Sequence, residues 1–319
     1  MTLDSTTLSH AHEMPSRARM LRLPRSPKVI AGLVILGVFT IVAIIGRWIT
    51  PYSPNRTDTQ NWVQHVLVPG TGLGTGFPAN YYPLPYGPSA AHWLGTDAVG
   101  RDVLSRLIYA SRVSMSVGIV SVAFYLTIGL ALGLLAGYAG GRVDGALMRA
   151  GDMVMAFPTL ILVMVIVALT GPSIWNIMAV IGLLGWPEVA RLVRGIVLTL
   201  RSQEFVLAAR AAGVRDAAIV VRHILPNTTG AAMVAATFGV ANAILVEAAL
   251  SFLGMGVQPP TASWGNMLSD AQSLTALEYM PWLWVPPGVM ILVTTLAVNF
   301  LGDGLRDALD PRSQLNRGG

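Results

Sequence analysis

The sequence has 319 residues, of which 53% are hydrophobic and 12% are charged, and this composition excludes an ordinary soluble domain. The net charge of +5 gives no reason to expect a nucleic-acid partner, because the basic residues that orient membrane spans account for it. The chain has no cysteine, which excludes disulfides and cysteine-ligated metal sites, and we expect no metal site. A polytopic membrane protein is the class that remains.

Charge-free apolar windows predict the membrane spans, since about 20 apolar residues are needed to cross about 30 Å of hydrocarbon. The windows are 29–46, 113–141, 153–187, 228–246 and 279–302. The third window is long enough for most of two spans and is interrupted at Gly171-Pro172, and Pro158 is expected to kink the first of the two. We therefore expect an all-α polytopic membrane protein with six transmembrane helices.

The polar segments divide the rest of the chain. Residues 1–26 lack a periodic apolar face and are expected to form a tail before a first transmembrane helix over 27–49. The segment 50–110 is expected to be an extracytoplasmic loop that ends in an interfacial helix. A five-helix transmembrane core over 111–304 and a C-terminal segment over 305–319 complete the chain.

Lysine and arginine predict the orientation, because they are enriched on the cytoplasmic side of membrane spans. If the N-terminus is cytoplasmic, sixteen of the 21 basic residues lie in segments on the inside. Five lie outside, and the segment 255–278 has none. Both termini are therefore expected to be cytoplasmic, together with the polar stretch 201–227.

Three charged residues lie where the outer loop leads into the second span. Asp97, Arg101 and Asp102 precede an apolar repeat at helical spacing, and Asp102 is placed to cap that helix. We expect these residues to form an extracytoplasmic brace. Direct contact with a transported substrate is the alternative, and the sequence does not decide between the two.

Two polar residues inside predicted spans are candidates for a translocation path or gate. Glu247 lies in the fifth span, expected from Thr228 to about Leu250, where an ionisable group is costly and is usually turned toward a partner or an aqueous path. A structural partner is an equally weighted account of Glu247. Asn299, near the inner end of the last span, is the second candidate.

A glycine repeat in the second span predicts close helix packing. Gly129, Gly133 and Gly137 are spaced four residues apart, which places them on one helix face. Such a face lets another helix approach closely, and it gives no indication of a ligand.

The stretch 201–227 is the longest charged segment between apolar runs, and it predicts a helical elbow. Ser202 is placed to cap a first helix, and Gly213 can end it in the left-handed conformation. Asp216 is placed to cap a second helix, which Pro226-Asn227 is expected to end. The small side chains Ala208, Ala209 and Ala212 form a face that can sit in a groove of another protein.

These motifs resemble the C-type permeases of dipeptide, oligopeptide and nickel ABC importers. Leu207-Ala-Ala-Arg-Ala-Ala-Gly213, with Ile219 and His223-Ile-Leu-Pro-Asn227, is similar to the loop that docks on the ATPase subunit. Further similar motifs, in order, are Leu94-Gly-Thr-Asp-Ala-Val-Gly-Arg-Asp102, Gly185-Trp-Pro187, Ala190-Arg-Leu-Val-Arg194, Leu250-Ser-Phe-Leu-Gly254, Val257-Gln-Pro-Pro260 and Gly302-Asp-Gly-Leu-Arg-Asp-Ala-Leu-Asp-Pro311. In one departure from the family pattern, Leu207 stands where an acidic residue is usual.

The resemblance implies a type I ABC importer permease fold with cytoplasmic coupling helices, in a bacterial cytoplasmic (inner) membrane. Its partners would be a second permease, forming a heterodimer, two ATPase subunits that bind ATP and Mg, and an extracytoplasmic binding protein. The coupling loop would extend over 191–227. The residues assigned to it are Glu204, Leu207, Ala208, Ala209, Gly213, Asp216, Ile219, His223, Pro226 and Asn227.

The sequence indicates transport without catalysis by this chain. It contains no phosphate-binding loop, and its one lysine is Lys28, so ATP hydrolysis is expected on another subunit. Peptides are the expected substrate, with nickel, another metal complex or haem as alternatives. An ion-coupled secondary transporter is the alternative from a different class, although the spans contain almost none of the titratable groups that it needs.

The basic-residue distribution makes the topology testable in this cysteine-free chain. A cysteine placed at Ser202 should be labelled only from the cytoplasmic side, and one placed at Thr71 only from outside, because the two lie on opposite sides of the predicted spans. Membrane-impermeant thiol labelling of intact cells and of inverted vesicles measures this. Labelling of position 202 from outside would contradict the orientation.

Overall fold

Helices make up the described part of the chain, which in the computed structural model is residues 27–57 and 87–309. In these ranges the extended pairing is limited to two isolated bridges, Thr57 with Arg101 and Thr96 with Asp102. The predicted tail 1–26, residues 58–86 of the predicted outer loop (with Thr71) and residues 310–319 lie outside the described residues. The all-α class predicted from the sequence is confirmed.

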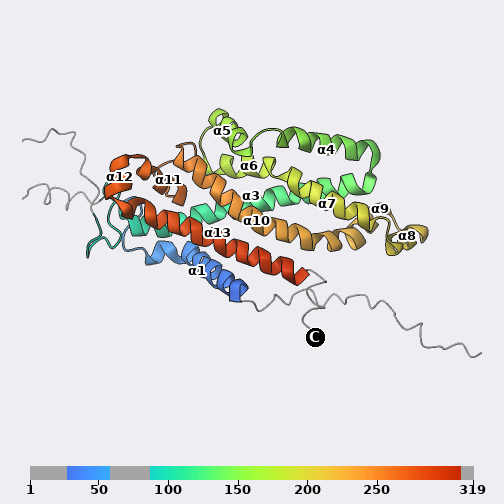
Figure 1. The fold of residues 1–319 in the computed structure, drawn as a ribbon, viewed down its shortest axis with the longest axis horizontal. Helices are drawn as coiled ribbons and strands as arrows, with labels where there is room; N and C mark the ends of the chain where they lie inside the picture. The colour runs from blue at the N-terminus through green and yellow to red at the C-terminus, as the bar shows by residue number, and fades with distance from the viewer. Residues whose placement is uncertain (1–26, 58–86, 310–319) are drawn as a thin grey trace, which may run out of the picture.

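The long helices run side by side in one bundle (Figure 1). In chain order the elements are α1 (Pro27–Ile49), α3 (Val103–Ala139), α4 (Gly141–Met155), α5 (Thr159–Thr170), α6 (Ile174–Leu184), α7 (Trp186–Leu200), α8 (Glu204–Ala211), α9 (Asp216–Ile219), the π-helix η2 (Val220–Ile224), α10 (Leu225–Phe252), α11 (Trp264–Leu268), the 3-10 helix η3 (Ser269–Gln272), α12 (Leu274–Tyr279) and α13 (Pro281–Leu309).

α3 is the central helix of this bundle. It packs against α7, α10, α6 and α1, while α13 packs against α10 and α1. Figure 1 places α8 and α9 at one end of the bundle and α11 and α12 at the opposite end. These are called the elbow end and the loop end below.

Among the described residues, five helical segments are long and apolar enough to cross a membrane. They are Pro27–Gly46, Val103–Ala139, Ile174–Leu200, Asp216–Phe252 and Pro281–Leu309. The pair of α4 and α5 supplies a sixth if it is counted as one span. The structure therefore agrees with the six spans that the apolar windows predict, with one of them broken.

The broken span differs in shape from the prediction. Pro158 was expected to kink a span that began at Met153, but α4 ends at Met155, α5 begins at Thr159, and the two helices meet at 84°. Proline lacks the donor that would continue the helix, and it disfavours a helical conformation at Phe157. α5 has 12 residues, or about 18 Å, which is too short to cross the hydrocarbon alone.

Two other predicted breaks do not occur. An interfacial helix was expected before the second span, but α3 is one helix of 37 residues from Val103 to Ala139. No glycine or proline lies in its first four turns, so nothing in this segment ends the helix. The fifth span was expected to begin at Thr228, but it is helical from Asp216 to Phe252.

The predicted glycine face of α3 is confirmed as a close packing surface, and its partner is α7. A Cβ atom added at Gly133 would lie 2.6 Å from the carbonyl oxygen of Ala190, and one at Gly137 would lie 2.7 Å from the Cβ atom of Val197. Gly129 approaches Val189 in the same way. Because only hydrogen fits at these positions, the two backbones lie closer than any other side chain would allow.

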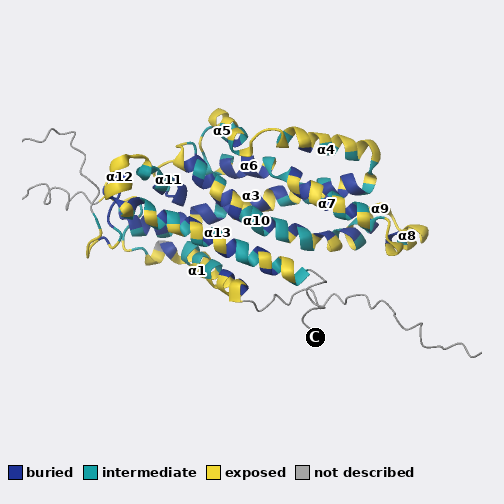
Figure 2. Cartoon of the chain, in the orientation of Figure 1, coloured by how far each residue is buried: buried dark blue, intermediate teal, exposed yellow. Residues whose placement is uncertain are grey.

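Figure 2 shows exposed residues along α1 and α5, and many of the exposed residues of the bundle are large and hydrophobic. Leu169, Trp175 and Ile161 are among the large hydrophobic side chains that are mostly exposed. In water such a surface would be unfavourable, whereas lipid tails are as apolar as these side chains. The surface is therefore the one that a membrane protein presents to its surroundings.

The glycine seam yields a stability prediction. Gly133→Ala should destabilise the protein by about 1–3 kcal/mol, because the new methyl group overlaps a backbone carbonyl on α7. Gly195→Ala on α7 is the matched control, since a Cβ there meets nothing within 4 Å and alanine favours helix. Thermal unfolding in detergent measures both. Equal midpoints for the two variants would contradict the close approach.

Candidate functional site

The elbow consists of α8, a turn and α9, and its turn has the geometry predicted for Gly213. Gly213 has φ +77°, and its N–H donates to the carbonyl of Arg210 at 3.0 Å. The N–H of Val214 donates to the carbonyl of Ala209 at 3.1 Å. These two bonds form a Schellman motif, which ends α8 and satisfies carbonyls that would otherwise lack partners.

Neither of the two predicted N-caps is present. α8 begins after Gln203, which makes no side-chain cap, and the hydroxyl of Ser202 donates to the carbonyl of Thr199 at 3.0 Å. Ser202 is therefore satisfied by the end of the preceding helix. α9 begins at Asp216 itself, and the carboxylate of Asp216 accepts a hydrogen bond from the hydroxyl of Tyr138.

Pro226 and Asn227 do not end the second arm of the elbow, contrary to the prediction. Pro226 lies in the first turn of α10, where a missing N–H is tolerated, and the π-helix η2 precedes it. The amide of Asn227 donates to the carbonyl of His223 at 2.6 Å. The elbow is thus continuous with the α10 span, and the wider π-helical turn marks the junction between them.

Most of the predicted coupling-loop residues lie on the surface of the elbow. Leu207 is 50% exposed, whereas Val206 beside it and Ile219 on α9 are completely buried. The rings of Phe205 and His223 lie 6.4 Å apart, so the first arm also meets η2, directly after the second arm, through these side chains. The remaining predicted residues are exposed at Glu204, Ala208, Gly213, Asp216, Pro226 and Asn227, and partly exposed at Ala209 and His223.

The motif-based reasoning missed a tyrosine that holds the elbow. Tyr138, in the last turn of α3, contacts both arms, because its hydroxyl donates to Asp216 and accepts from Arg210 at 3.0 Å. Arg201, just before the elbow, donates to the carbonyl of Gly137 at 3.1 Å. No sequence pattern links residue 138 to residue 216, since the contact depends on how α3 packs.

Two ion pairs hold the amphipathic helix α4 on α7. Arg194 makes a two-bond contact with Asp144, in which Nη2 and Oδ2 are 2.6 Å apart. Arg191 pairs with Asp152 at 2.6 Å. These pairs connect α4, the first part of the broken span, to α7, and both arginines lie on the helix that leads into the elbow.

The three predicted brace residues come together at the loop end. Asp97 accepts from the N–H and the Nε of Arg101 at 2.9 and 2.7 Å, and it lies 3.4 Å from the Nε of Arg106. Asp102 caps α3, as predicted, by accepting from the N–H of Ser105 at 2.7 Å, and it also pairs with His92 at 2.9 Å. Both carboxylates are buried and fully engaged, which favours the brace interpretation; substrate contact stays a prediction.

A third carboxyl group, that of Asp270, lies beside this cluster. Burial, together with the negative charge of Asp97, raises the pKa of Asp270 to about 6. Asp270 belongs to η3, in the second loop, whereas Asp97 belongs to the first. The cluster therefore brings charged groups from both loops to one place.

Glu247 is completely buried at the loop end of α10. Its carboxyl group accepts from the hydroxyl of Ser251 at 2.7 Å and from that of Ser114 on α3 at 3.2 Å. Ser114 also accepts from the N–H of Trp264 on α11, at 3.1 Å. Glu247 thus joins three helices, which favours the structural account of this residue, and its role in a path or gate stays a prediction.

Asn299 does not lie near Glu247 in the bundle. It lies partly exposed on α13, well past the loop end at which that helix begins, whereas Glu247 is only five residues from the loop end of α10. The two candidate path residues therefore lie at different depths in the bundle, and a path role for Asn299 also stays a prediction. Among the described residues, no cluster of three or more His, Asp or Glu side chains could hold a metal ion.

Comparison with known proteins is consistent with this architecture. Residues 129–314 match the family described as binding-protein-dependent transport system inner membrane component. Residues 16–69 match the N-terminal transmembrane domain of oligopeptide transport permease C.

Similar proteins cover nearly the whole chain. A candidate peptide permease of Brucella suis is 40% identical over 92% of this chain and 90% of its own length. A dipeptide transport system permease of Alkalihalophilus pseudofirmus is 39% identical over 93% of this chain and 90% of its own. A glutathione transport system permease of Pectobacterium atrosepticum is 38% identical over 89% of this chain and 86% of its own.

Proposed function

The chain belongs to the family of binding-protein-dependent transport system inner membrane components, and from this we propose that it forms the translocation path of an ATP-driven peptide importer. It is a permease subunit of an ABC importer, and membership of this family implies no catalytic role for the chain itself. The observation that carries the proposal is the combination of this family match with an exposed elbow whose two arms meet at the Gly213 turn.

Peptides are the substrate class that the relatives support. Proteins that are 38–40% identical are named for peptide, dipeptide and glutathione transport. Nickel, another metal complex and haem remain the alternatives from the resemblance.

The elbow is the proposed contact with the ATPase subunit. Its surface offers the apolar side chain of Leu207 and the small side chain of Ala208, with Glu204 one turn before Leu207. Full burial of a leucine contributes about 1.5–3 kcal/mol, so docking here would depend on shape more than on charge. The elbow and both termini would face the cytoplasm, in a bacterial inner membrane.

The proposed assembly contains this chain, a second permease as a heterodimer, two ATPase subunits that bind ATP and Mg, and an extracytoplasmic binding protein. The binding protein would dock at the loop end, where the buried cluster around Asp97 lies beside Asp270 of the second loop. An ion-coupled secondary transporter is less well supported, because the completely buried Glu247 is occupied by two serine hydroxyls.

A transport experiment tests the function. The complex, purified through a tag on this chain and reconstituted with its binding protein, should import labelled dipeptides only with ATP. The chain alone should show no ATP-dependent thermal shift, because it has no phosphate-binding loop. ATPase activity in a preparation free of other subunits would contradict the assignment, and uptake of nickel or haem without peptide uptake would contradict the substrate.

A second experiment tests docking by shape. Gly213→Val should reduce transport more than Glu204→Ala, because a β-branched residue at φ +77° costs on the order of 1–3 kcal/mol and would swing the second arm away. The space around Gly213 is open, so the effect would come from backbone conformation and not from a clash.

Gly145→Val on α4 is the matched control, since this glycine also has open space but an ordinary helical backbone. Transport and ATPase rates of the reconstituted complex are the measurements. The shape-led model is wrong if Gly213→Val couples normally, or if Glu204→Ala is the more damaging of the two changes.

A further inference from the structure

The elbow is tied to α3 through one side chain that contacts both of its arms. The Tyr138 hydroxyl donates to the Asp216 carboxylate on α9 and accepts from the Arg210 guanidinium on α8 at 3.0 Å. The guanidinium also lies 5.4 Å from the centre of the tyrosine ring, within the range of a cation–π contact. Arg210 and Asp216 are themselves 4.0 Å apart, so the three groups form a closed triangle.

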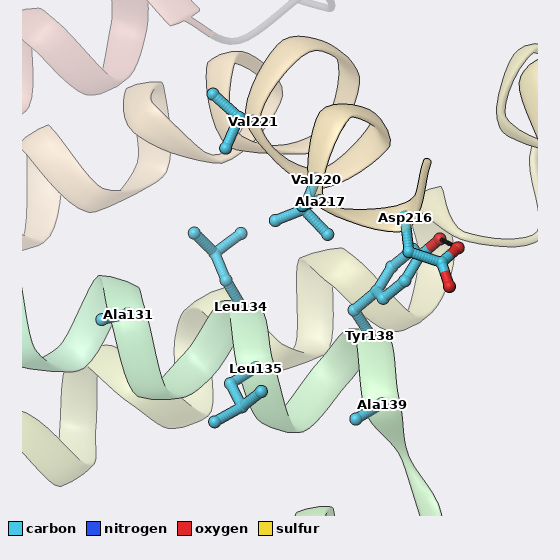
Figure 3. Close-up of a pocket in the computed structure, with 9 residues that line it drawn as sticks. All are labelled: Ala131, Leu134, Leu135, Tyr138, Ala139, Asp216, Ala217, Val220 and Val221. Carbon is cyan, nitrogen blue, oxygen red and sulfur yellow. Dashed lines mark hydrogen bonds between the residues drawn. The ribbon is translucent and has the colours of Figure 1, made fainter. Parts of the chain in front are cut away.

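Beside this triangle, α3 is separated from α9 and η2 by a groove of about 370 Å³ (Figure 3). Its walls are apolar: Leu134 and Leu135 come from α3, and Ala217, Val220 and Val221 come from α9 and η2. Figure 3 shows the bonded pair of Tyr138 and Asp216 at one end of the groove. Side-chain packing between α3 and the α9–η2 segment is therefore incomplete. At one end of the groove, the hydrogen bonds of the triangle connect the two instead.

The second arm lies between two adjustable joints. Gly213, at φ +77°, precedes it, and the π-helix η2 (Val220–Ile224) follows it. π-helical turns are uncommon and often occur at functional sites, and glycine adopts more backbone conformations than any other residue. A short helix between two such joints can change its angle with little strain.

The triangle can be broken at low cost. The side chains of Arg210 and Asp216 are 53% and 71% exposed, and exposed ion pairs contribute only about 0–1 kcal/mol. A buried contact of the same geometry would be much harder to open. The triangle therefore has a defined geometry, and its contacts can separate at little cost in free energy.

We propose that Tyr138 is a positioning residue that couples movement of the elbow to α3, and that its hydroxyl bond to Asp216 is made and broken during transport. The proposal rests on the function proposed above. Movement of the second arm would reach the end of α3 through Tyr138. The movement would then pass from α3 to α7 through the glycine seam. Arg201, at the end of α7, adds a second connection, because it donates to the carbonyl of Gly137 at 3.1 Å.

Tyr138→Phe tests the proposal, because it removes the hydroxyl and keeps the ring. In the reconstituted complex, peptide transported per ATP hydrolysed should fall about two- to tenfold, the range that corresponds to one net hydrogen bond. Tyr109→Phe is the matched control, since Tyr109 also lies on α3 but near the loop end, and its ratio should stay at the wild-type value. Equal losses of transport and ATPase activity in Tyr138→Phe leave the ratio unchanged and would overturn the proposal.

A double-mutant cycle tests whether the bond to Asp216 is responsible. If Tyr138→Phe and Asp216→Asn act through the same contact, the double variant should have about the same transport-to-ATP ratio as the more impaired single variant. If the double variant instead reduced the transport-to-ATP ratio by the product of the two single effects, the two residues would act separately and the proposed contact would be wrong.

A distance measurement separates this proposal from the proposed function. Spin labels on cysteines at Arg142 and Val214, in the full-length chain in nanodiscs, report the position of the elbow relative to the end of α3. Tyr138→Phe should broaden the distance distribution and Tyr109→Phe should not, and an unchanged distribution would overturn the proposal. A wild-type complex that imports no peptide would overturn the proposed function, and the distance measurement would still decide on the role of Tyr138.

Discussion

The close approach of α3 and α7 is the constraint on which the rest of the structure depends. Membrane helices gain little from hydrophobic burial against one another, so their association relies on tight van der Waals contact. Gly129, Gly133 and Gly137 supply that contact against Val189, Ala190, Val193 and Val197. Because α7 leads directly into the elbow and α3 ends beside it, the seam determines where the elbow lies. Tyr138, one residue after Gly137, is brought to the elbow by the same packing.

The elbow is joined to the bundle differently on its two sides. On one side, α8 follows α7 after a short turn, and on the other side α9 runs through a π-helix into α10 without a break. The second arm is therefore connected to the α10 span through the π-helix, while the first arm is held by local contacts. The Schellman motif at Gly213 joins the two arms, and Tyr138 contacts both of them from α3.

The loop end is held by polar contacts that water does not reach. Glu247 connects α10 to α3 through Ser114, whose hydroxyl also accepts the N–H of Trp264. Asp97 pairs with Arg101, just before α3, and with Arg106 in its first turns, with Asp270 of the other loop nearby. A buried carboxyl group is stable only when hydrogen bonds or opposite charges surround it. Both loops are therefore anchored to the bundle itself, which provides a rigid outer surface on a chain without disulfides.

The sequence by itself determined the features that depend on a single segment. Span length is set by local apolar composition, the seam by the four-residue glycine spacing, and the turn at Gly213 by the backbone freedom of one residue. Tertiary structure decided the rest. Pro226 lies in a helix that continues from the π-helix η2, Glu247 accepts hydrogen bonds from hydroxyls on two helices, and Tyr138 meets Asp216 across 78 residues of chain. Contacts of this kind depend on how the spans pack against one another, and local sequence patterns do not specify that arrangement.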